Sequence, residues 1–519
     1  MNALPPWLTP LLPAETMRAV DRWAIDECGV SGLDLMERAG AAVARAVELA
    51  APDGPVTVVC GKGNNGGDGL VVARLLRDAG RAVSVICTAP PGEFTGDALT
   101  NLERLQGAPP TQLDGPLDPC AVVVDALLGT GFEGEPRGAV ADAIDAVNAS
   151  GAQVVSVDVP SGVDASTGVV AGRAVRADTT VTFHAAKPGL WIRPGKAHAG
   201  QVETIDIGIP RGAPGAASIG LIDASVLRAL RRRGAASTKF TSGHVLVAGG
   251  SRGLTGAPTM AARASMRAGA GYVTACVPAS LQAILASSGT PELMTVGLPD
   301  EDGALKAEGV AEVLRRVERG GALALGPGLG RSAGAVAFAR TLAHDAQIPL
   351  VLDADGLNAH AGRLEDLSAR SAATVLTPHA GELARLLELD GGEEVERDRL
   401  RHVRSAAERS AAVVVLKGDD TLVAAPDGRV AVSRGASPAL ATAGTGDVLT
   451  GIVAALLAQD LDAFTAASAG VWLHARAGRE AARRVELAEG VVASDVIDAI
   501  VAGRVDGYRE LGEERGVDG

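Results

Sequence analysis

Short hydrophobic runs alternate along the chain with longer segments in which apolar and polar positions repeat with a helical period. The runs VTVVC, AVSVIC, AVVVDALLG and VVSVDVPSG come first, and each is preceded or followed by an Ala-rich amphipathic segment. Continuous apolar runs of this length are typical of strands that are buried on both faces of a parallel sheet. The pattern therefore predicts an α/β fold built from strand–helix–strand units.

The strand–helix pattern lapses once, at residues 207–218, and then restarts. This interval, IGIPRGAPGAAS, is rich in Gly and Pro. The strand-like runs that follow it are GHVLVAGGSRG, ALALGPGLG, PLVLDADG, ATVLTPHAGE and AVVVLKGDD. We therefore expect two α/β domains, residues 1–214 and residues 215–519.

Two features near the C-terminus add detail to the second domain. The segment LVAAPDGRVAVSRG places Asp427 and Gly428 between two apolar runs, and this arrangement predicts a β-hairpin. The last segment, from about Asp495, is expected to be helical at first and then polar.

Composition restricts the kinds of partner that the chain can have. With 519 residues, of which 47% are hydrophobic, the chain can bury substantial cores. The formal net charge of -14 argues against nucleic acids and anionic membranes as partners, because such contacts depend on a basic surface. Any anionic ligand must therefore be captured by local features of a site.

Cysteine usage and the N-terminus indicate the compartment. The five cysteines form no C-x-x-C pair, which fits reduced thiols. The start of the chain, MNALPPWLTPLLPAE, lacks a basic region and is interrupted by prolines, and no apolar stretch approaches the ~20 residues of a membrane span. We therefore expect a cytoplasmic protein without a membrane partner.

The strand at residues 56–60 leads directly into the loop GKGNNGGDG and then into a helix expected to begin near Asp68. Glycines allow backbone N–H groups to surround an anion, and the positive end of the helix would add to the attraction. The loop formally matches the dinucleotide motif G-x-G-x-x-G, but the next strand, AVSVICTAP, supplies no acidic residue for the ribose. Asn64, Asn65 and Asp68 instead add side-chain oxygens that a simple phosphate loop does not require.

Four loops of the first domain fall at the carboxyl ends of predicted strands, where open parallel sheets bind ligands. They are NNGGD, DALLGTGFEGE, DVPSG and FHAAKPG. Asn65, Asp125 and Ser161 in these loops are hard oxygen donors, and Asp158 with Lys187 could carry protons. Each residue also has a simpler interpretation: the two carboxylates could satisfy loop amides, and Lys187 could be a solvated surface lysine.

The motifs NNGGDG, DALLGTG, DVPSG and KPG, in this order and spacing, resemble the NAD(P)H-hydrate epimerase domain over roughly the first 210 residues. The resemblance implies a Rossmann-like three-layer domain in which Asn65, Asp125 and Ser161 help to bind a potassium ion. By the same resemblance, the hydrated dinucleotide would be held by Asn64, Asn65, Gly66, Gly67, Asp68, Gly129, Thr130, Gly131, Phe132, Glu133, Gly134, Glu135 and Asp158.

The second domain carries a different phosphate-binding motif, TAGTGDVLTGIVAALL. Gly444 and Gly446 shape a turn, and Asp447 opens a strongly apolar helix. Backbone amides of such a turn can stabilise phosphoryl oxygens, and a carboxylate there can take the proton of an attacking hydroxyl. This is the logic of ribokinase-like enzymes, although Asp447 could also simply cap its helix. No Walker A motif occurs in the sequence.

Together with GGSRGLTGAP, GPGLG, DADGLN, TPHAGE and KGDDT, this motif resembles the ADP-dependent NAD(P)H-hydrate dehydratase over roughly the remaining 290 residues. The resemblance implies a ribokinase-like three-layer domain. It also implies that the hydrate contacts Ala257, Gly328, His379 and Asp447. The adenine nucleotide would be held by Lys417, Gly418, Asp419, Asp420, Thr421 and Gly446. The sequence His379-Ala-Gly-Glu382 replaces the Asn-x-x-Glu of sugar kinases, which weakens a plain sugar-kinase interpretation.

The two resemblances together imply a bifunctional repair enzyme for NADH and NADPH that have gained water, the hydrates NADHX and NADPHX. The first domain would interconvert their R and S epimers, with Asp158 and Lys187 as catalytic residues. The second domain would dehydrate the S form, because Asp447 activates the added hydroxyl toward ADP, and AMP and phosphate would be released. We expect potassium in the first domain, Mg²⁺ with ADP in the second, and a homo-oligomer.

Two other functions remain open from the sequence. One is a ribokinase-like small-molecule kinase fused to a regulatory nucleotide-binding domain without catalytic activity. The other is a protein-interaction scaffold. The pair of possible proton carriers, Asp158 and Lys187, favours the repair enzyme, because a nucleotide sensor would not need them.

Overall fold

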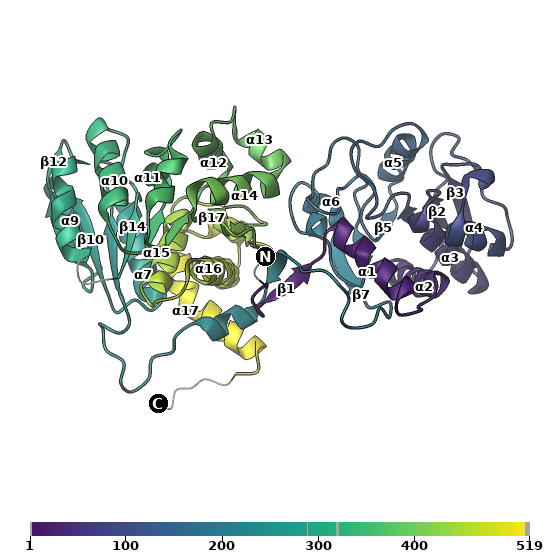
Figure 1. The fold of residues 1–519 in the computed structure, drawn as a ribbon, viewed down its shortest axis with the longest axis horizontal. Helices are drawn as coiled ribbons and strands as arrows, with labels where there is room; N and C mark the ends of the chain where they lie inside the picture. The colour runs from purple at the N-terminus through teal and green to yellow at the C-terminus, as the bar shows by residue number, and fades with distance from the viewer. Residues whose placement is uncertain (1–2, 288, 318–320, 514–519) are drawn as a thin grey trace. The chain divides into compact units, whose positions relative to one another are not determined.

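The computed structural model describes residues 3–287, 289–317 and 321–513. The chain forms two compact units: one is Pro10–Ile219, and the other comprises Gly220–Gly519 together with the residues up to Thr9 (Figure 1). The sequence had placed the whole N-terminus in the first domain. The first residues group with the second unit because β1 (Leu8–Leu11) is the edge strand of its sheet, beside β8 (Ile219–Ile222).

The first unit is built on a six-stranded sheet in the order β3-β2-β4-β5-β6-β7. All its neighbouring strands pair in parallel, so the predicted parallel sheet is confirmed. The strands are β2 (Val56–Cys60), β3 (Val83–Cys87), β4 (Val122–Ala126), β5 (Gln153–Val157), β6 (Thr179–Phe183) and β7 (Gln201–Ile205).

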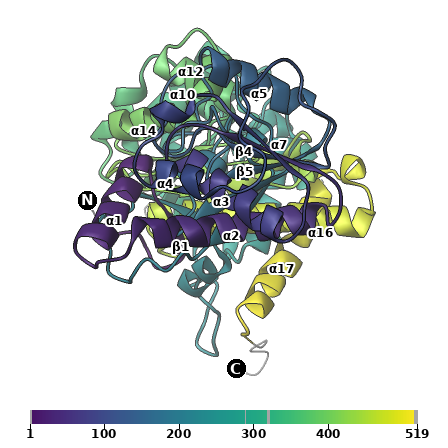
Figure 2. The ribbon, with the colours of Figure 1, turned by 90° about the vertical axis from the view of Figure 1, so that its right-hand side faces the viewer.

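Helices cover both faces of this sheet. Alternate residues of each strand point to opposite faces, so each face has its own set of apolar side chains for helices to pack against. Val58 contributes to the larger core on one face, and Val59 contributes to the smaller core on the other. The larger core contains α1 (Ala14–Asp26), α2 (Gly32–Ala50), α3 (Asn64–Asp78) and α4 (Gly96–Arg104), whereas α5 (Ala139–Ala149) packs in the smaller one (Figures 1 and 2). Shorter elements are η1 (Pro91–Glu93), η2 (Pro188–Leu190) and α6 (Lys196–Ala199).

The glycine-rich motif of the first unit is not a flexible loop. Helix α3 begins at Asn64, four residues before the predicted start, with Gly63 as its N-cap. A Cβ atom on Gly66 would lie 1.8 Å from the carbonyl oxygen of Gly61, and one on Gly61 would lie 2.0 Å from that of Leu127. The glycines are therefore required by close packing of the helix start against the neighbouring loops.

The second unit contains an 11-stranded sheet in the order β1-β8-β19-β18-β17-β16-β15-β14-β9-β10-β11. The strands from β17 to β11 in this order pair in parallel, and β18 and β19 form the predicted antiparallel hairpin. The strands after β8 are β9 (His244–Ala248), β10 (Tyr272–Pro278), β11 (Met294–Leu298), β14 (Ala322–Leu325), β15 (Leu350–Leu352), β16 (Thr374–Leu376), β17 (Val413–Leu416), β18 (Leu422–Ala424) and β19 (Val430–Val432). A small separate hairpin joins β12 (Asp300–Glu301) and β13 (Ala304–Leu305).

This sheet also lies between two helical layers (Figure 1). One layer, which shares a core with the sheet, contains α7 (Gly256–Arg267), α15 (Thr445–Leu457), α16 (Ala463–Val485) and α17 (Ala493–Glu510). The other contains α9 (Val310–Val317), α10 (Ala333–Asp345), α12 (Ala380–Leu387) and α14 (Arg399–Ser410). The remaining elements are η3 (Ala224–Ala229), η4 (Ala279–Leu281), α8 (Gln282–Ala286), η5 (Ala307–Gly309), α11 (Ala354–Asn358), η6 (Leu364–Ala369), α13 (Gly392–Arg397), η7 (Pro438–Leu440) and η8 (Ala488–Gly490).

The C-terminal helix expected from about Asp495 is confirmed as α17, and the end of the predicted polar tail, residues 514–519, lies outside the described residues. Within the described part of the chain, no helix combines the length and the apolar composition required to cross a bilayer. Both units are thus three-layer α/β structures, as predicted.

Candidate active sites

The first unit has a cavity of about 800 Å³ lined by the loops that follow β2, β4, β5 and β6. Predicted residues that line it are Asn64, Asn65, Asp68, Gly129, Thr130, Gly131, Phe132, Asp158 and Lys187. The described lining does not include Gly66, Gly67, Glu133, Gly134 and Glu135. Gly66 and Gly67 are buried in the packing of α3, whereas Glu133 to Glu135 are exposed.

Lys187 is buried and forms an ion pair with Asp158 in this cavity. Its side chain is 1% exposed, and its Nζ lies 2.6 Å from Oδ1 of Asp158. The same ammonium donates to the Thr182 hydroxyl over 2.8 Å and to the Phe183 carbonyl over 3.0 Å. An ammonium has three protons, so all three are used within the protein. The interpretation of Lys187 as a solvated surface lysine is therefore wrong.

Asp158 is held from several directions. Besides Lys187, the Thr182 hydroxyl donates to Oδ1 over 3.1 Å, and the backbone N–H of Thr130 donates to Oδ2 over 3.3 Å. Its backbone has a φ of 67°, which is an uncommon conformation for a residue other than glycine. This fixed carboxylate lines the cavity, so it is placed to exchange a proton with a bound molecule.

Two further carboxyl groups face the same cavity, and both are shifted toward the protonated form. Burial, together with the charges of Asp158 and Asp21, raises the pKa of Asp68 well above its usual range, and Lys187 only partly opposes this. Burial also raises the pKa of Asp21, where the charge of Lys187 lowers it and that of Asp158 raises it. The cavity thus combines a carboxylate paired with an ammonium and carboxyl groups that favour a proton.

The sequence analysis did not identify Asp21, which lies on α1. The residue is placed among Met17, Val20 and Ala24, which are three of the four buried residues of that helix. A carboxylate on the apolar face of an amphipathic helix was the available signal, because a buried charge normally has a partner or a function.

Asp125, the predicted potassium ligand, is fully buried at the end of β4. The Ser161 hydroxyl donates to Oδ1 over 2.5 Å, and the Ser161 N–H and the Ser156 hydroxyl donate to Oδ2 over 2.9 and 2.8 Å. Burial raises the pKa of Asp125 overall. These hydrogen bonds, together with one from the Leu127 N–H, oppose part of that rise. Loop amides therefore do bind this carboxylate, as the simpler interpretation proposed.

The same region lacks a protein cation but has an unsatisfied amide. Within the described residues, no Lys, Arg or His nitrogen lies within 4.0 Å of the Asp125 carboxylate. Nδ2 of Asn65 is buried without a hydrogen-bond partner, and its side chain lies against Gly129. A buried carboxylate, a hydroxyl and an amide oxygen are hard donors that suit a cation such as potassium. No cluster of three or more His, Cys, Asp or Glu residues suited to a metal occurs in the described part of the chain.

In the second unit, Asp447 lies in the first turn of α15, as predicted. The N-cap of this helix is Gly444, whose φ of 89° lies in the left-handed region that favours glycine. A Cβ atom on Gly446 would lie 3.5 Å from Nζ of Lys417. The ammonium of Lys417 and the helix start are thus adjacent, and both are attractive to phosphoryl oxygens.

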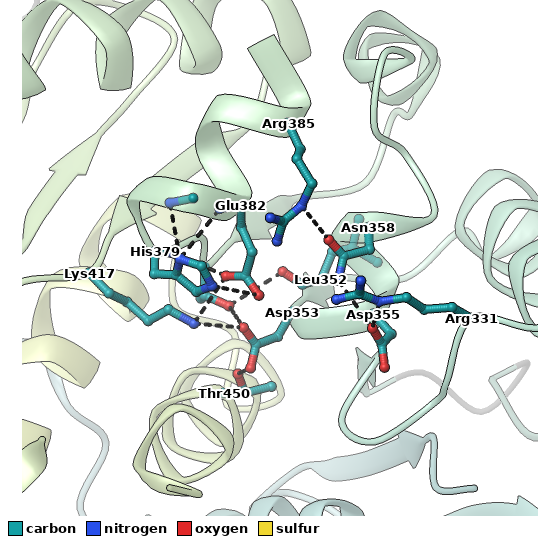
Figure 3. A network of polar contacts seen from close by, with 12 residues as sticks. Arg331, Leu352, Asp353, Asp355, Asn358, His379, Glu382, Arg385, Lys417 and Thr450 are labelled. Carbon is teal, nitrogen blue, oxygen red and sulfur yellow. Dashed lines mark hydrogen bonds and ion pairs between the residues drawn. The ribbon is translucent and has the colours of Figure 1, made fainter. Parts of the chain in front are cut away.

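Lys417 is positioned by two carboxylates, one at the start of α11 and one in the first turn of α12 (Figure 3). Its Nζ lies 3.0 Å from Oδ1 of Asp353 and 3.7 Å from Oε2 of Glu382. Asp353 is almost fully buried, and it accepts hydrogen bonds from the hydroxyls of Thr377 at 2.8 Å and Thr450 at 2.7 Å. The motifs DADGLN and TPHAGE were recognised in the sequence, but these contacts of Asp353 and Glu382 were not predicted.

This network raises the pKa values of both Asp447 and Lys417. Burial and the charge of Asp353 raise the pKa of Asp447 from 3.8 to about 7, and Lys417 opposes this shift. Burial lowers the pKa of Lys417, but the charges of Asp353, Glu382 and Asp447 outweigh it and raise that pKa overall. Near neutral pH, Lys417 therefore keeps its charge while Asp447 can accept a proton.

His379 is the N-cap of α12 and accepts hydrogen bonds from the N–H groups of Gly381 at 3.0 Å and Glu382 at 3.4 Å through Nδ1. Burial lowers the pKa of His379, so its neutral form is favoured. With Nδ1 as acceptor, Nε2 carries the proton and can donate it.

Two other predicted substrate contacts, Ala257 and Gly328, are neighbours. A Cβ atom on Gly328 would lie 3.1 Å from that of Ala257 and 2.5 Å from the carbonyl oxygen of Leu254. Gly328 has a φ of 63°, so this close approach requires glycine.

The predicted nucleotide loop at residues 417–421 is only partly open to a ligand. Asp420 is fully buried and pairs with Arg399, whose Nε lies 3.1 Å from Oδ2. The Thr421 hydroxyl bonds to both the N–H and the carbonyl oxygen of Gly418. The side chains of Asp420 and Thr421 therefore shape the loop, whereas Lys417 extends toward Asp447.

Each half of the chain matches a known protein family. Residues 245–502 match the family model described as NAD(P)H-hydrate dehydratase, and residues 32–189 match the one described as YjeF-related protein N-terminus. A bifunctional NAD(P)H-hydrate repair enzyme from Moorella thermoacetica is 41% identical over 507 residues, covering 94% of this chain and 95% of that protein. The corresponding enzyme from Salinibacter ruber is also 41% identical, with 95% of each chain covered.

Solved structures are also similar to part of the chain. The ADP/ATP-dependent NAD(P)H-hydrate dehydratase of Bacillus subtilis, crystallised with ATP and Mg²⁺, has 25% sequence identity and a TM-score of 0.46. The match covers 55% of this chain and 98% of that structure. From its near full-length similarity to the curated relatives, the chain belongs to the family of bifunctional NAD(P)H-hydrate repair enzymes.

Proposed function

We propose that the two activities of this family divide between the two units. The unit from Pro10 to Ile219, which corresponds to the predicted domain 1–214, would epimerise NADHX and NADPHX. The other unit, which corresponds to residues 215–519, would dehydrate the S epimers at the expense of ADP. The observation that carries this assignment is that each unit has its own lysine and carboxyl group at the carboxyl edge of its sheet. Lys187 is paired with Asp158 in one, and Lys417 lies beside the first turn of α15, which carries Asp447, in the other.

In the epimerase unit, Asp158 is the proposed base and Asp68 the proposed acid. Lys187 forms an ion pair with Asp158, whereas burial raises the pKa of Asp68 well above its usual range. Two carboxyl groups with opposite protonation in one cavity can remove and return protons during a single reaction. Lys187 is then a positioning residue, because none of its protons is free for the substrate.

Residues 64–68 and 129–135 would surround the dinucleotide.

Potassium is proposed to bind beside this cavity, held by Asn65, Asp125 and Ser161. Its charge would neutralise the buried carboxylate of Asp125 and attract the negative groups of the dinucleotide. The oxygen atoms of these three side chains, with Asp125 fully buried, support this proposal.

In the dehydratase unit, Asp447 is proposed to take the proton from the hydroxyl group that the added water left on the ring. The freed oxygen attacks the terminal phosphate of ADP, and AMP is released. The phosphate then leaves with its oxygen, the ring loses a proton, and the double bond is restored. Lys417 and the amides of residues 444–446 would stabilise the charge on the transferred phosphoryl group.

The nucleotide is proposed to enter with Mg²⁺. Since Mg²⁺ retains several waters and is held largely by phosphates, few protein ligands are required. Asp353 and Glu382 are the carboxylates beside Lys417 that could approach it. The nucleotide itself would lie against Gly446 and residues 417–421, and Ala257, Gly328 and His379 would contact the hydrate.

A mixture of R and S hydrates tests both activities at once. With ADP, we expect complete recovery of reduced-nicotinamide absorbance by the wild-type protein. Asp158→Asn should stop at the S fraction, and Asp447→Ala should recover neither epimer. If the wild-type protein recovered only the S fraction, the epimerase assignment would fail. A stable phosphorylated product would instead favour the small-molecule kinase. Loss of turnover in Asp447→Ala would argue against the scaffold, and an unaltered rate would exclude Asp447 as the base.

We also propose that the protein is cytoplasmic and forms a homo-oligomer. The five cysteines are free thiols, which agrees with a reducing cytoplasm. A homo-oligomer and the preference for ADP over ATP remain predictions, which light scattering and exchange of the nucleotide in the same assay would test.

A further inference from the structure

The dehydratase site continues away from Asp447 along the edge of the sheet. Lys417, His379, Asp355 and Gly330 follow β17, β16, β15 and β14, which are consecutive neighbours in the sheet. Since adjacent strands lie about 4.8 Å apart, this edge extends for about 14 Å. A dinucleotide with its ring at Asp447 is long enough to follow it, so groups at the far end can contact its phosphates.

Arg385 is one such group, on the second turn of α12. Its Nε donates to Oδ1 of Asn358 over 2.9 Å, and its Nη1 lies 3.8 Å from the position of a Cβ on Gly381. The side chain therefore lies back toward the helix start, where His379 is the N-cap. Within the described residues, its Nη groups have no hydrogen-bond acceptor and no carboxylate within 4.0 Å. Its charge and several donors are thus open to a ligand.

Arg331 approaches the same place from the loop after β14. Its Nε lies 2.9 Å from Oδ1 of Asp355, and its side chain is 69% exposed. Asp355 also accepts hydrogen bonds from Nδ2 of Asn358 at 3.1 Å and from the N–H of Gly330 at 3.0 Å. Asn358 thus links Arg385 to Asp355, the partner of Arg331, and Figure 3 shows both arginine side chains beside Asn358.

The charges of this cluster favour an anion. The cluster contains two guanidinium groups and one carboxylate, that of Asp355, so its net charge is positive. The chain as a whole has a formal net charge of -14. Fixed guanidinium groups match the geometry of phosphate oxygens and lose less freedom on binding than mobile surface arginines. An arginine that was merely solvated would not need Asn358 or Asp355 to orient it.

We propose that Arg331 and Arg385 form a subsite for a phosphate group of the dinucleotide hydrate, with Asn358 and Asp355 orienting the two guanidinium groups. This proposal rests on the dehydratase function proposed above, and the shared chemistry is a phosphate oxygen. In NADPHX it could belong to the 2′-phosphate of the adenosine ribose or to the pyrophosphate. In NADHX only the pyrophosphate is present.

The test compares Arg331→Gln, Arg385→Gln and the double variant with the wild-type protein. KM and kcat are measured for purified S epimers of NADHX and NADPHX at saturating ADP. We expect KM to rise by about 10–100-fold in the double variant, with kcat little changed, because charged hydrogen bonds to the substrate are lost. Arg315→Gln is the matched control, since Arg315 is also exposed and ion-paired but lies on α9.

The two substrates distinguish the source of the phosphate. A rise confined to NADPHX assigns the subsite to the 2′-phosphate, and an equal rise for both substrates assigns it to the pyrophosphate. Unchanged KM values for both substrates in the double variant would overturn the proposal, as would a rise in the KM for ADP alone.

Binding of NADPH and NADH, followed by their fluorescence, separates this proposal from the function on which it rests. If the wild-type protein binds these products but dehydrates neither hydrate, the proposed function fails, while weaker binding by the double variant still supports the subsite. Equal binding by the wild-type and double-variant proteins contradicts the subsite whether or not dehydration is observed.

Discussion

Lys187 donates a hydrogen bond to Asp158 over 2.6 Å and has no N–H left for a substrate, because Thr182 and Phe183 accept hydrogen bonds from the other two. The lysine that the sequence offered as an acid or base therefore maintains the charge of the carboxylate beside it. This relationship predicts that Lys187→Met lowers the epimerase rate by about 10²–10⁴. Recovery of NADH from the R hydrate and ADP by the variant, whose own dehydratase unit is unchanged, provides the measurement.

The dehydration of purified S hydrate should be unaffected by Lys187→Met, because the substitution lies in the other unit. Lys306→Met is a suitable control, since Lys306 is partly exposed and its ion pair with Glu301 is long, at 3.8 Å. An R-hydrate rate within the range of this control would show that the ion pair does not support catalysis.

The same ion pair makes a separate prediction about stability. Removing Lys187 alone leaves the buried carboxylate of Asp158 without a charged partner, which costs about 3–5 kcal/mol. In Asp158→Asn/Lys187→Met, neither charge remains, so the double variant should be more stable than Lys187→Met. Urea unfolding followed by a probe in the first unit tests this, and a double variant as unstable as the sum of the single variants would contradict it.

Asp68 should control the alkaline limb of the epimerase reaction. Because its pKa is raised, the proton that it supplies is present at low pH and is lost as pH rises through that pKa. Asp68→Asn should reduce the rate and remove this limb from the pH profile of kcat. Asp78→Asn, at the exposed end of the same helix, is the control. An alkaline limb that persists in Asp68→Asn would exclude Asp68 as its source.

The sequence was sufficient to predict the layers of the fold and the edge of each sheet at which chemistry occurs. Strand β2 has an unbroken apolar sequence, and parallel strands place the loops after them together. The close approaches at Gly61 and Gly66 depend on atoms from other segments, so the sequence suggested a flexible loop where the structure has a helix start.

The sequence also did not predict which side chains pair when the partners are distant along the chain. Asp420 stands beside Asp419 in a motif that suggests nucleotide contacts, yet its partner is Arg399, 21 residues away. Asp21 precedes every recognised motif, and only the folded chain brings it to the cavity with Asp158. The sequence identifies chemical groups, whereas their availability depends on which of them the fold pairs with one another.

Potassium should affect both the activity and the stability of the first unit. If it neutralises Asp125, replacing potassium by a bulky organic cation should lower the epimerase rate and the melting temperature of this unit. Asp125→Asn should have a melting temperature that no longer depends on potassium, because the buried charge is absent. The dehydratase unit serves as the internal control. Melting temperatures that respond equally to potassium in the wild-type protein and Asp125→Asn would contradict this site.

Asp447 predicts opposite effects of pH on activity and stability in the second unit. The dehydratase rate should rise as Asp447 loses its proton, with an acid limb near its pKa of about 7. Asp353→Asn removes a charge that raises this pKa, so the limb should move to lower pH. Asp366→Asn, at an exposed surface residue, should leave it in place. A limb that stayed fixed in Asp353→Asn would contradict the proposed coupling.

The stability effect has the opposite sign. The pKa of Asp447 is raised from 3.8 to about 7 by folding, so its favourable contribution is present below pH 3.8 and is lost as pH rises toward 7. Asp447→Asn cannot ionise, and it should therefore be more stable than the wild-type protein at pH 8, by about 1–3 kcal/mol, although it is inactive. The difference should disappear near pH 4. Urea unfolding of the second unit at both pH values checks this, and equal stabilities at pH 8 would show that folding does not raise the pKa of Asp447.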